Sequence, residues 1–455
     1  MATHPPGSLA VVEEAFRIPD FSFVHAADLH LDTPFKGIGS TAPFVAGQLR
    51  EASLAAFDSL VDLCLERKAA FLVVAGDIYD GPERGLRAQL RFRDGLQRLS
   101  DAGISSFVVH GNHDPVETGW SALGDTWPER VTVFGAGAAQ AVTVEIGGIP
   151  FATVQGVSFA QRSETENLAL RFAGRAGPGI QVGVLHCNVG GAAPGYGDYS
   201  PCTLDDLRSV GLDYWALGHI HTGMVLSGRP GSEEPWVVYP GNLQARSPKP
   251  SERGPKGAVI VHVRAGRVAA VEPVSCDVVR FGLVEADVAD VVDLGELRAR
   301  LASASRDRLA SADGRSLVLR GSLVGQSDLY LDLHRPGALD DLLRALREDF
   351  ADEDPFCWWD SIEDLSRPAI DVDSARAGTD FAADLIALAD ALGRRIETDE
   401  DALGELAAEL SEGLPGPLRT QRALERLLTS HGPALDELVD RALLLALGEL
   451  DGERR

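Results

Sequence analysis

The sequence predicts an α/β layer fold, because short apolar runs alternate with segments of helical periodicity. Five such runs, each stopped by polar residues, read FSFVHAADLH, AAFLVVAGDIYD, SSFVVHGNHD, QVGVLHCNV and YWALGHIH. Residues 48–67 and 86–99, between the first three runs, carry apolar side chains at helical spacing. Alternating strands and helices are typical of α/β folds, and continuous apolar runs indicate strands buried on both faces.

Further elements follow along the chain and divide it into three predicted domains. The segment TLDDLRSVG predicts a short helix with Thr203 as its N-cap and Gly211 at its end. PWVVYPGN and GAVIVHVRAGRVAAVEPV predict strands joined by glycine turns. We therefore expect a main domain over residues 20–275. A small α/β accessory domain of the capping type is expected over 276–368, and an acidic helical segment over 369–455.

The composition restricts the class of protein. The 455 residues carry a formal net charge of -26, and the residues after 275 contain no lysine and most of the excess acid. A general nucleic-acid coat protein or a membrane-surface binder normally presents a basic face. The five cysteines are scattered without a Cys-x-x-Cys pair, and no apolar run is long enough to span a bilayer. We expect a cytoplasmic protein with reduced thiols and no membrane partner.

Each apolar run ends in side chains of metal-ligand types. The carboxyl ends of strands in an open α/β sheet gather at one edge. The pairs Asp-x-His and His-x-His place two side chains on the same side of an extended segment. The residues of these types at the five run ends are Asp28, His30, Asp77, Asp80, Asn112, His113, Asp114, His186, His219 and His221.

The chemistry of this set predicts two divalent ions. Oxygen and imidazole donors suit manganese, iron or zinc better than copper or an iron–sulfur cluster. Six or seven ligands exceed the needs of one catalytic ion, whereas two ions can share a carboxylate and act together on a phosphate. Any one of these residues alone is better explained by a capping or turn role. His25 and His110 lie inside the runs and are expected to be packed.

At these residues the chain resembles the calcineurin-like metallophosphoesterases. The ordered blocks of that family are D-x-H, G-D, G-N-H-[DE], H and G-H-x-H, and all five occur in order over residues 28–221. The stretches GVLHCNVGG and VVYPGNLQARSPK resemble in particular the bacterial DNA-repair exonuclease branch of the SbcD/YhaO type. The resemblance implies the two-sheet sandwich of this family, flanked by helices, and weakens beyond Cys276.

The resemblance also implies a role for each site residue. One ion would be held by Asp28, His30 and His221, and the other by Asn112, His186 and His219. Asp77 would bridge the two ions. His113 would be the catalytic proton donor or would stabilise the transition state, and Asp80 would orient it. The metal implied is manganese, with iron, zinc and magnesium as alternatives.

The implied substrate is DNA, and the implied partners are an SMC-like ABC-type ATPase and a second copy of the chain. Basic side chains near the second block and after the last one are candidates for DNA contacts: Arg84, Arg87, Arg91, Arg246 and Lys249. The alternative is that these side chains are simply solvated.

Two other functions stay open at this point. The acidic C-terminal part favours a hydrolase of small phosphodiesters or nucleotides, because negative charge repels DNA. A docking subunit for an ATPase with a minor catalytic role is the third reading, although the intact ligand set argues against it. Residues 369–455 either pack on their own chain or dock a protein partner.

Overall fold

The computed structural model describes residues 19–33, 43–81, 85–117, 126–190, 197, 199–398 and 433–452. The chain forms two compact units. The first comprises the chain up to Gly282 with residues 312–318 and 354–358, and the second comprises the remaining residues from Leu283 onward. The domain boundaries expected at residues 276 and 369 stay predictions, because compactness does not test which segments fold by themselves. In the described ranges no helix combines the length and the apolar composition that crossing a bilayer requires.

The first unit is a sandwich of two six-stranded sheets, which confirms the predicted fold class. The first sheet has the order β12-β11-β1-β2-β3-β4. Strands β1 to β4 run parallel, and β11 joins β1 antiparallel. The strand bounds are β1 (Phe21–Ala26), β2 (Phe71–Ala75), β3 (Ser105–Val109), β4 (Val131–Val133), β11 (Gly257–Arg264) and β12 (Arg267–Ser275).

The second sheet has the order β5-β6-β7-β8-β10-β9. Its inner strands β6, β7, β8 and β10 are parallel, and antiparallel strands close both edges. The bounds are β5 (Gln140–Ile146), β6 (Ile149–Val157), β7 (Ile180–His186), β8 (Tyr214–Gly218), β9 (Met224–Ser227) and β10 (Trp236–Tyr239).

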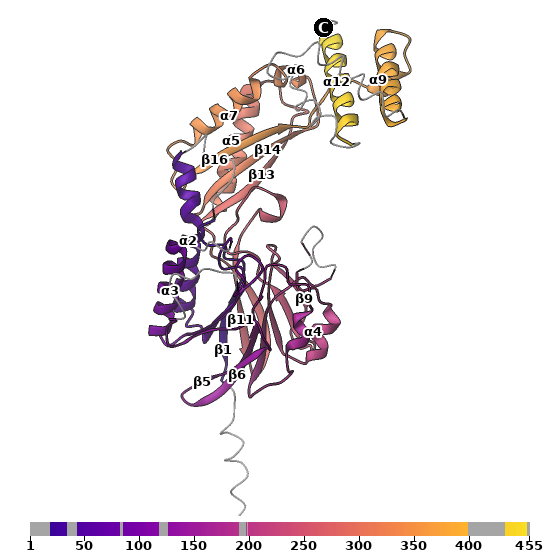
Figure 1. The fold of residues 1–455 in the computed structure, drawn as a ribbon. Coiled ribbons are helices and arrows are strands. Elements are labelled where there is room, and N and C mark those ends of the chain that lie inside the picture. The colour runs from indigo at the N-terminus through magenta and orange to yellow at the C-terminus, as the bar shows by residue number, and fades with distance from the viewer. Residues whose placement is uncertain are drawn as a thin grey trace, which may run out of the picture. The chain divides into compact units, whose positions relative to one another are not determined.

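Strand β2 shows why both faces of the first sheet are apolar. Phe71 and Val73 point into the core between the two sheets, whereas Leu72 and Val74 point toward the helices. Those helices are α2 (Pro43–Glu66) and α3 (Leu86–Asp101), and Figure 1 shows them beside β1 and β11. The outer face of the second sheet is covered by α4 (Leu204–Val210), whose Leu207 is fully buried. Burial on both faces explains the continuous apolar runs of the sequence.

The short helix α4 begins and ends as the sequence predicts. The Thr203 side chain accepts a hydrogen bond from the Asp206 backbone N–H, and Asp206 accepts one from the Thr203 N–H in return. Gly211 ends the helix in the left-handed conformation at φ 79°. Reciprocal capping and a C-terminal glycine together satisfy the free backbone groups of the first and last turns.

The mixed α/β part lies mainly in the second unit, which also carries the C-terminal helices. Strands β13 (Val279–Asp287), β14 (Ser316–Val324) and β16 (Cys357–Asp364) form a sheet in that order. Helices α5 (Leu294–Ala310) and α7 (Ala338–Asp349) are joined by two hydrogen bonds that Arg298 donates to Asp349. The remaining elements are β15 (Gln326–Ser327), α6 (Tyr330–Leu333), β17 (Arg367–Pro368), α8 (Val372–Arg376), α9 (Phe381–Thr398) and α12 (Pro433–Gly452).

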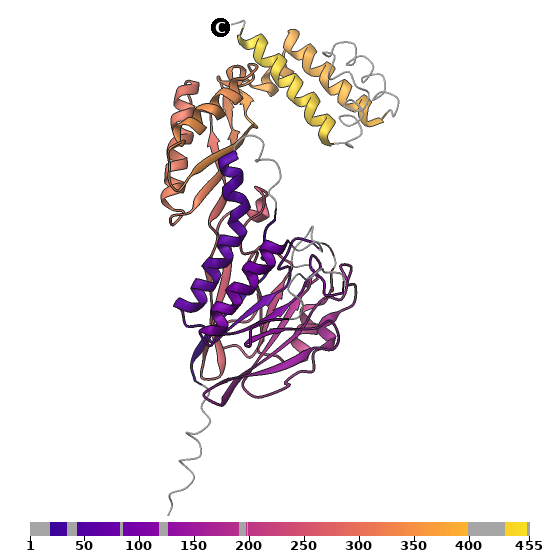
Figure 2. The ribbon, with the colours of Figure 1, turned by 60° about the vertical axis from the view of Figure 1, so that its left-hand side comes forward.

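Helices α9 and α12 lie side by side in this unit (Figure 2). Ala382 and Ile386 of α9 bury against Leu447 of α12. The apolar face predicted for residues 369–455 is therefore partly covered within the described part of the same segment. Phe381 and Leu388 of α9 stay more than half exposed.

Candidate metal centre

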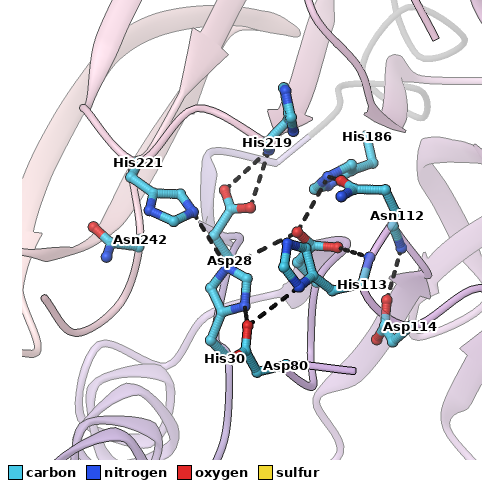
Figure 3. A network of polar contacts seen from close by, with 12 residues as sticks. Asp28, His30, Asp80, Asn112, His113, Asp114, His186, His219, His221 and Asn242 are labelled. Carbon is cyan, nitrogen blue, oxygen red and sulfur yellow. Dashed lines mark hydrogen bonds and ion pairs between the residues drawn. The ribbon is translucent and has the colours of Figure 1, made fainter. Parts of the chain in front are cut away.

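Five strand ends converge on one buried site, as Figure 3 shows. Each strand of the parallel core ends where its loop bends over the sheet edge. Asp28 and His30 follow β1, Asp77 follows β2, and Asn112 follows β3. His186 is the last residue of β7, and His219 and His221 follow β8. All of these side chains are buried except that of His221, which is partly buried.

The backbone at this site is strained in a way that the sequence does not reveal. Asp28, His30, Asp77 and His219 all have positive φ, between 42° and 106°, although none of them is glycine. Such conformations are costly for residues with a Cβ and cluster at functional sites. The packed strands behind the site hold these residues in place and aim their side chains inward.

One group of donors meets at the end of β7. Nδ1 of His186 lies 2.9 Å from the Ala75 carbonyl oxygen, which can only accept, so this nitrogen carries the proton. Burial lowers the pKa of His186 to about 4, so the ring is neutral and Nε2 is an acceptor. Nε2 nevertheless lies 3.0 Å from the amide oxygen of Asn112 and 3.5 Å from Oδ2 of Asp77. Nε2 of His186, the Asn112 amide oxygen and Oδ2 of Asp77 are thus three acceptor atoms that face one another. A cation bound among them would explain this arrangement.

A second group of donor side chains also has acceptor atoms that face one another. Nε2 of His30 lies 3.2 Å from Nε2 of His221. The other nitrogen of each ring faces a carboxylate: Nδ1 of His221 bonds Glu252 at 2.7 Å, and Nδ1 of His30 lies 3.3 Å from Asp80 in a poorly aligned charge contact. Carboxylates favour the proton on Nδ1 in both rings, so the two Nε2 lone pairs point at each other. Asp28 completes this group.

Two buried carboxylates lie between the groups. Oδ2 of Asp77 is 3.9 Å from Nε2 of His30 in one group and 3.5 Å from Nε2 of His186 in the other. Burial raises the pKa of Asp77 to about 6, and burial together with the charge of Asp77 raises the pKa of Asp28. Keeping two neighbouring buried carboxylates ionised costs free energy unless a nearby cation compensates their charges. The position of Asp77 suits the predicted bridge.

His219 differs from the other predicted ligands. Its backbone N–H donates to both carboxylate oxygens of Asp28 at 3.0 and 3.1 Å. Its Nε2 lies 3.1 Å from the Gly197 carbonyl oxygen. Nε2 of His219 is therefore engaged by the chain in this structure.

His113 lies beside both groups and contacts the chain through Asp80. Its Nδ1 is 3.2 Å from Oδ1 of Asp80, and its backbone N–H donates to Asp77. Burial alone would lower the pKa of His113, but the hydrogen bond to Asp80 and the charge of Asp77 outweigh it and hold the pKa above its usual value. Arg246 donates to the same oxygen of Asp80 at 2.7 Å. His113 is thus kept as a proton donor, which is the geometry expected for its predicted role.

Most of the predicted DNA contacts that the structure describes are paired with acids. Arg84 lies outside the described residues. Arg87 pairs with Glu51, and Arg91 pairs with Asp58, both across the α2–α3 interface. Arg246 is engaged by Asp80, whereas Lys249 is exposed at the start of a short 3-10 helix (Pro250–Glu252). Three of the four described side chains therefore already have a carboxylate partner.

Two carboxylates that the motif left without a role support the site. Asp114 is fully buried and accepts from the Ile78 and Gly111 backbone N–H groups and from His110, so it ties the ends of β2 and β3 together. Glu252 accepts from His221. The sequence signal for Asp114 is its place in GNHD, and the only signal for Glu252 is an acid within the basic stretch ARSPKPSERGPK.

Comparison with known proteins settles the family. Residues 21–223 match the model of the calcineurin-like phosphoesterase family, and residues 281–367 match that of the YhaO metallophosphoesterase middle domain. A curated relative from Bacillus subtilis, described as "Uncharacterized metallophosphoesterase YhaO", is 35% identical over 75% of this chain and 81% of its own length. The chain belongs to the calcineurin-like metallophosphoesterases. It is therefore a metal-dependent hydrolase of phosphoesters, and the family uses divalent metals.

More distant relatives of this metallophosphoesterase carry the name "DNA double-strand break repair protein Mre11". Those from Aeropyrum pernix and Haloferax volcanii are each 26% identical, over 48% and 61% of this chain. The chain covers 53% and 57% of their lengths, so it spans little more than half of each. A solved dimetal phosphatase from Danio rerio aligns over 56% of this chain and 98% of its own, at 15% identity and a TM-score of 0.31.

Proposed function

We propose that this chain is a two-metal phosphodiesterase that cleaves DNA as an exonuclease or endonuclease subunit in repair. The observation that carries the proposal is the pair of donor groups around Asp77, each with acceptor lone pairs that face one another, with His113 held by Asp80 beside them.

Different residues of the site would hold the ions and transfer the proton. Asp28, His30 and His221 would hold one ion, Asn112, His186 and His219 the other, and Asp77 would serve both. When bound, two divalent ions supply Lewis-acid activation of a phosphate and of a water nucleophile. His113 donates its proton to the oxygen that leaves the phosphorus. Asp80 orients the His113 ring and favours its protonated form, and Arg246 holds Asp80 in place.

DNA as substrate rests on the relatives. The Mre11 proteins are named for double-strand break repair, and they are 26% identical to this chain over 48% and 61% of its length. The closer YhaO relative is named without a substrate. Manganese as the metal, an SMC-like ABC-type ATPase and a second copy of the chain as partners, and a cytoplasmic location belong to the same proposal.

A hydrolase of small phosphodiesters is the second candidate, and one observation favours it. Two arginines predicted to contact DNA, Arg87 and Arg91, are already paired with acids of α2. A phosphate would have to displace these acids to reach the arginines. The formal net charge of -26 adds a general repulsion of nucleic acid.

One experiment separates the candidates. Duplex DNA labelled at its 3′ end and bis-nitrophenyl phosphate are digested in parallel, with and without Mn²⁺, and His113→Ala serves as the matched inactive control. Manganese-dependent cleavage of both substrates supports the nuclease. Cleavage of the small ester alone supports the second candidate, and cleavage of neither by metal-loaded protein contradicts both.

A further inference from the structure

A buried carboxylate outside the predicted ligand set joins three segments of the chain behind the metal groups. Glu252 is 5% exposed and ends the short 3-10 helix that follows Lys249. Its Oε1 accepts from Nδ1 of His221 at 2.7 Å. Its Oε2 accepts from Nδ2 of Asn242 at 2.7 Å and from the Arg246 backbone N–H at 3.1 Å.

The donors around Glu252 make it a hydrogen-bond acceptor. The Asn242 amide and the Arg246 backbone N–H both donate to Oε2. A carboxylate that accepts on Oε2 also accepts on Oε1, where Nδ1 of His221 lies. The proton of a neutral His221 must therefore sit on Nδ1, and Nε2 is left as a lone pair aimed at Nε2 of His30, 3.2 Å away.

The same loop also holds the backbone of His221. Lys256 is 6% exposed, and its ammonium group donates to the carbonyl oxygens of His221 at 2.7 Å and of Ser251 at 2.8 Å. Glu252 thus holds the His221 ring, and Lys256 ties the backbone of His221 to that of the residue before Glu252. A metal ligand whose ring and backbone are both held in place loses little conformational entropy when it binds an ion.

We propose that Glu252 is a positioning residue for the metal centre, which fixes the tautomer and orientation of His221 so that Nε2 faces the ion held with Asp28 and His30. This inference rests on the proposed two-metal function and deepens it. It predicts that one of the two ions depends on Glu252, because only His221 among the predicted ligands bonds to it in the described structure.

The test compares Glu252→Gln with wild type in Co²⁺ binding. The amide keeps the size of the side chain but offers one acceptor oxygen to three donors, so His221 loses its fixed partner in part of the molecules. We expect Co²⁺ to bind one of its two sites about 10- to 100-fold more weakly, the usual effect of removing a partner of a metal-ligating histidine. The visible absorption spectrum of that Co²⁺ should change, whereas the other site should keep wild-type affinity.

Glu272→Gln is the matched control. Glu272 also accepts from a histidine, His262, at 2.8 Å, but this pair joins β11 to β12 and belongs to none of the candidate metal groups. The control should bind two Co²⁺ ions as wild type does. If it weakens binding equally, the loss in Glu252→Gln reflects general damage and the proposal fails.

A double-mutant cycle excludes an independent effect of Glu252. His221→Ala already removes the ligand, so adding Glu252→Gln should weaken metal binding no further. If Glu252→Gln fails to fold by circular dichroism, Glu252→Asp, whose shorter side chain withdraws the carboxylate from His221, is measured instead, and it should weaken one Co²⁺ site and leave the other at wild-type affinity. Wild-type affinity and spectrum in Glu252→Gln overturn the inference and leave the proposed function intact, whereas a wild-type chain that binds fewer than two ions contradicts the proposed function itself.

Discussion

At the scale of single residues, Asp80 links the candidate acid to the rest of the site. Its Oδ1 lies within 3.3 Å of His30, His113 and Arg246. Burial raises its pKa, but the hydrogen bond from His113, the contact with His30 and the charge of Arg246 outweigh burial and lower it well below the usual range. A negative charge beside His113 favours the protonated ring and raises its pKa, which suits a proton donor.

Replacing His113 by alanine should therefore remove the acid without emptying the metal groups. We expect kcat for bis-nitrophenyl phosphate to fall about 10²- to 10⁴-fold, the range of general acid–base catalysis. The metal content, measured by inductively coupled plasma mass spectrometry, should stay at the wild-type value. Loss of metal together with activity would make His113 a ligand.

Asp77 and His221 should differ in the number of ions that they control. Asp77 lies between the two groups, so Asp77→Ala should lower occupancy of both sites, whereas His221→Ala should lower mainly one. Metal analysis of the two purified, folded variants decides between these outcomes. Loss of a single ion in both variants would contradict a bridging role for Asp77.

The metal-free chain should lose stability in acid partly through Glu252. Its folded pKa of about 2 lies below the usual 4.5, so its contribution is complete above pH 4.5 and is lost as the pH falls toward 2. The shift corresponds to roughly 3 kcal/mol. Urea unfolding at pH 5 and pH 3 should show a smaller loss for Glu252→Gln than for wild type. Equal losses in the two proteins would mean that Glu252 titrates normally in the fold.

At the scale of elements, glycines let the loops after the strands approach one another. A Cβ on Gly111, which follows β3, would lie 2.3 Å from Oδ1 of Asp77. A Cβ on Gly218, at the end of β8, would lie 1.8 Å from the Ala75 carbonyl oxygen. Glycine at these two positions lets the backbones at the sheet edges lie closer together than a residue with a Cβ would allow. The metal-ligand side chains are therefore close enough to share ions.

Gly111→Ala should therefore displace the Asp77 carboxylate and weaken metal binding by at least tenfold, because ligand positions must hold within about 0.5 Å. Gly135→Ala is the control, since nothing lies within 4 Å of a Cβ at that position. Isothermal titration of both metal-free variants with Mn²⁺ measures the effect. Wild-type affinity in Gly111→Ala would show that the loop relaxes freely.

At the scale of the whole molecule, every candidate catalytic and metal residue precedes residue 257, whereas the acidic helical segment begins near residue 369. A chain that ends at Ser366 should keep metal-dependent hydrolysis of a small phosphodiester. The isolated segment 369–455 should show no salt-sensitive DNA binding in a filter assay across a salt series, because phosphate contacts need a basic face. A truncated chain that is folded, loaded with metal and inactive would show that the segment completes the site.

The sequence by itself determined the α/β layering, the five strands whose ends carry the site and the residue types at those ends, and the family resemblance added the two-sheet sandwich. Burial on both sheet faces imposes continuous apolar runs, and the ligand chemistry imposes aspartate, asparagine and histidine after them. Both requirements act on the residues of each short stretch, so the strands and the ligand types can be recognised from the sequence without coordinates.

Only the tertiary structure decided which partners each side chain meets. Glu252 reaches His221 across 31 residues, and Arg246 reaches Asp80 across 166. Arg87 and Arg91 pair with α2 instead of forming an open basic surface. Such pairings depend on how distant loops close over the sheet edge, and no local preference or spacing encodes that closure.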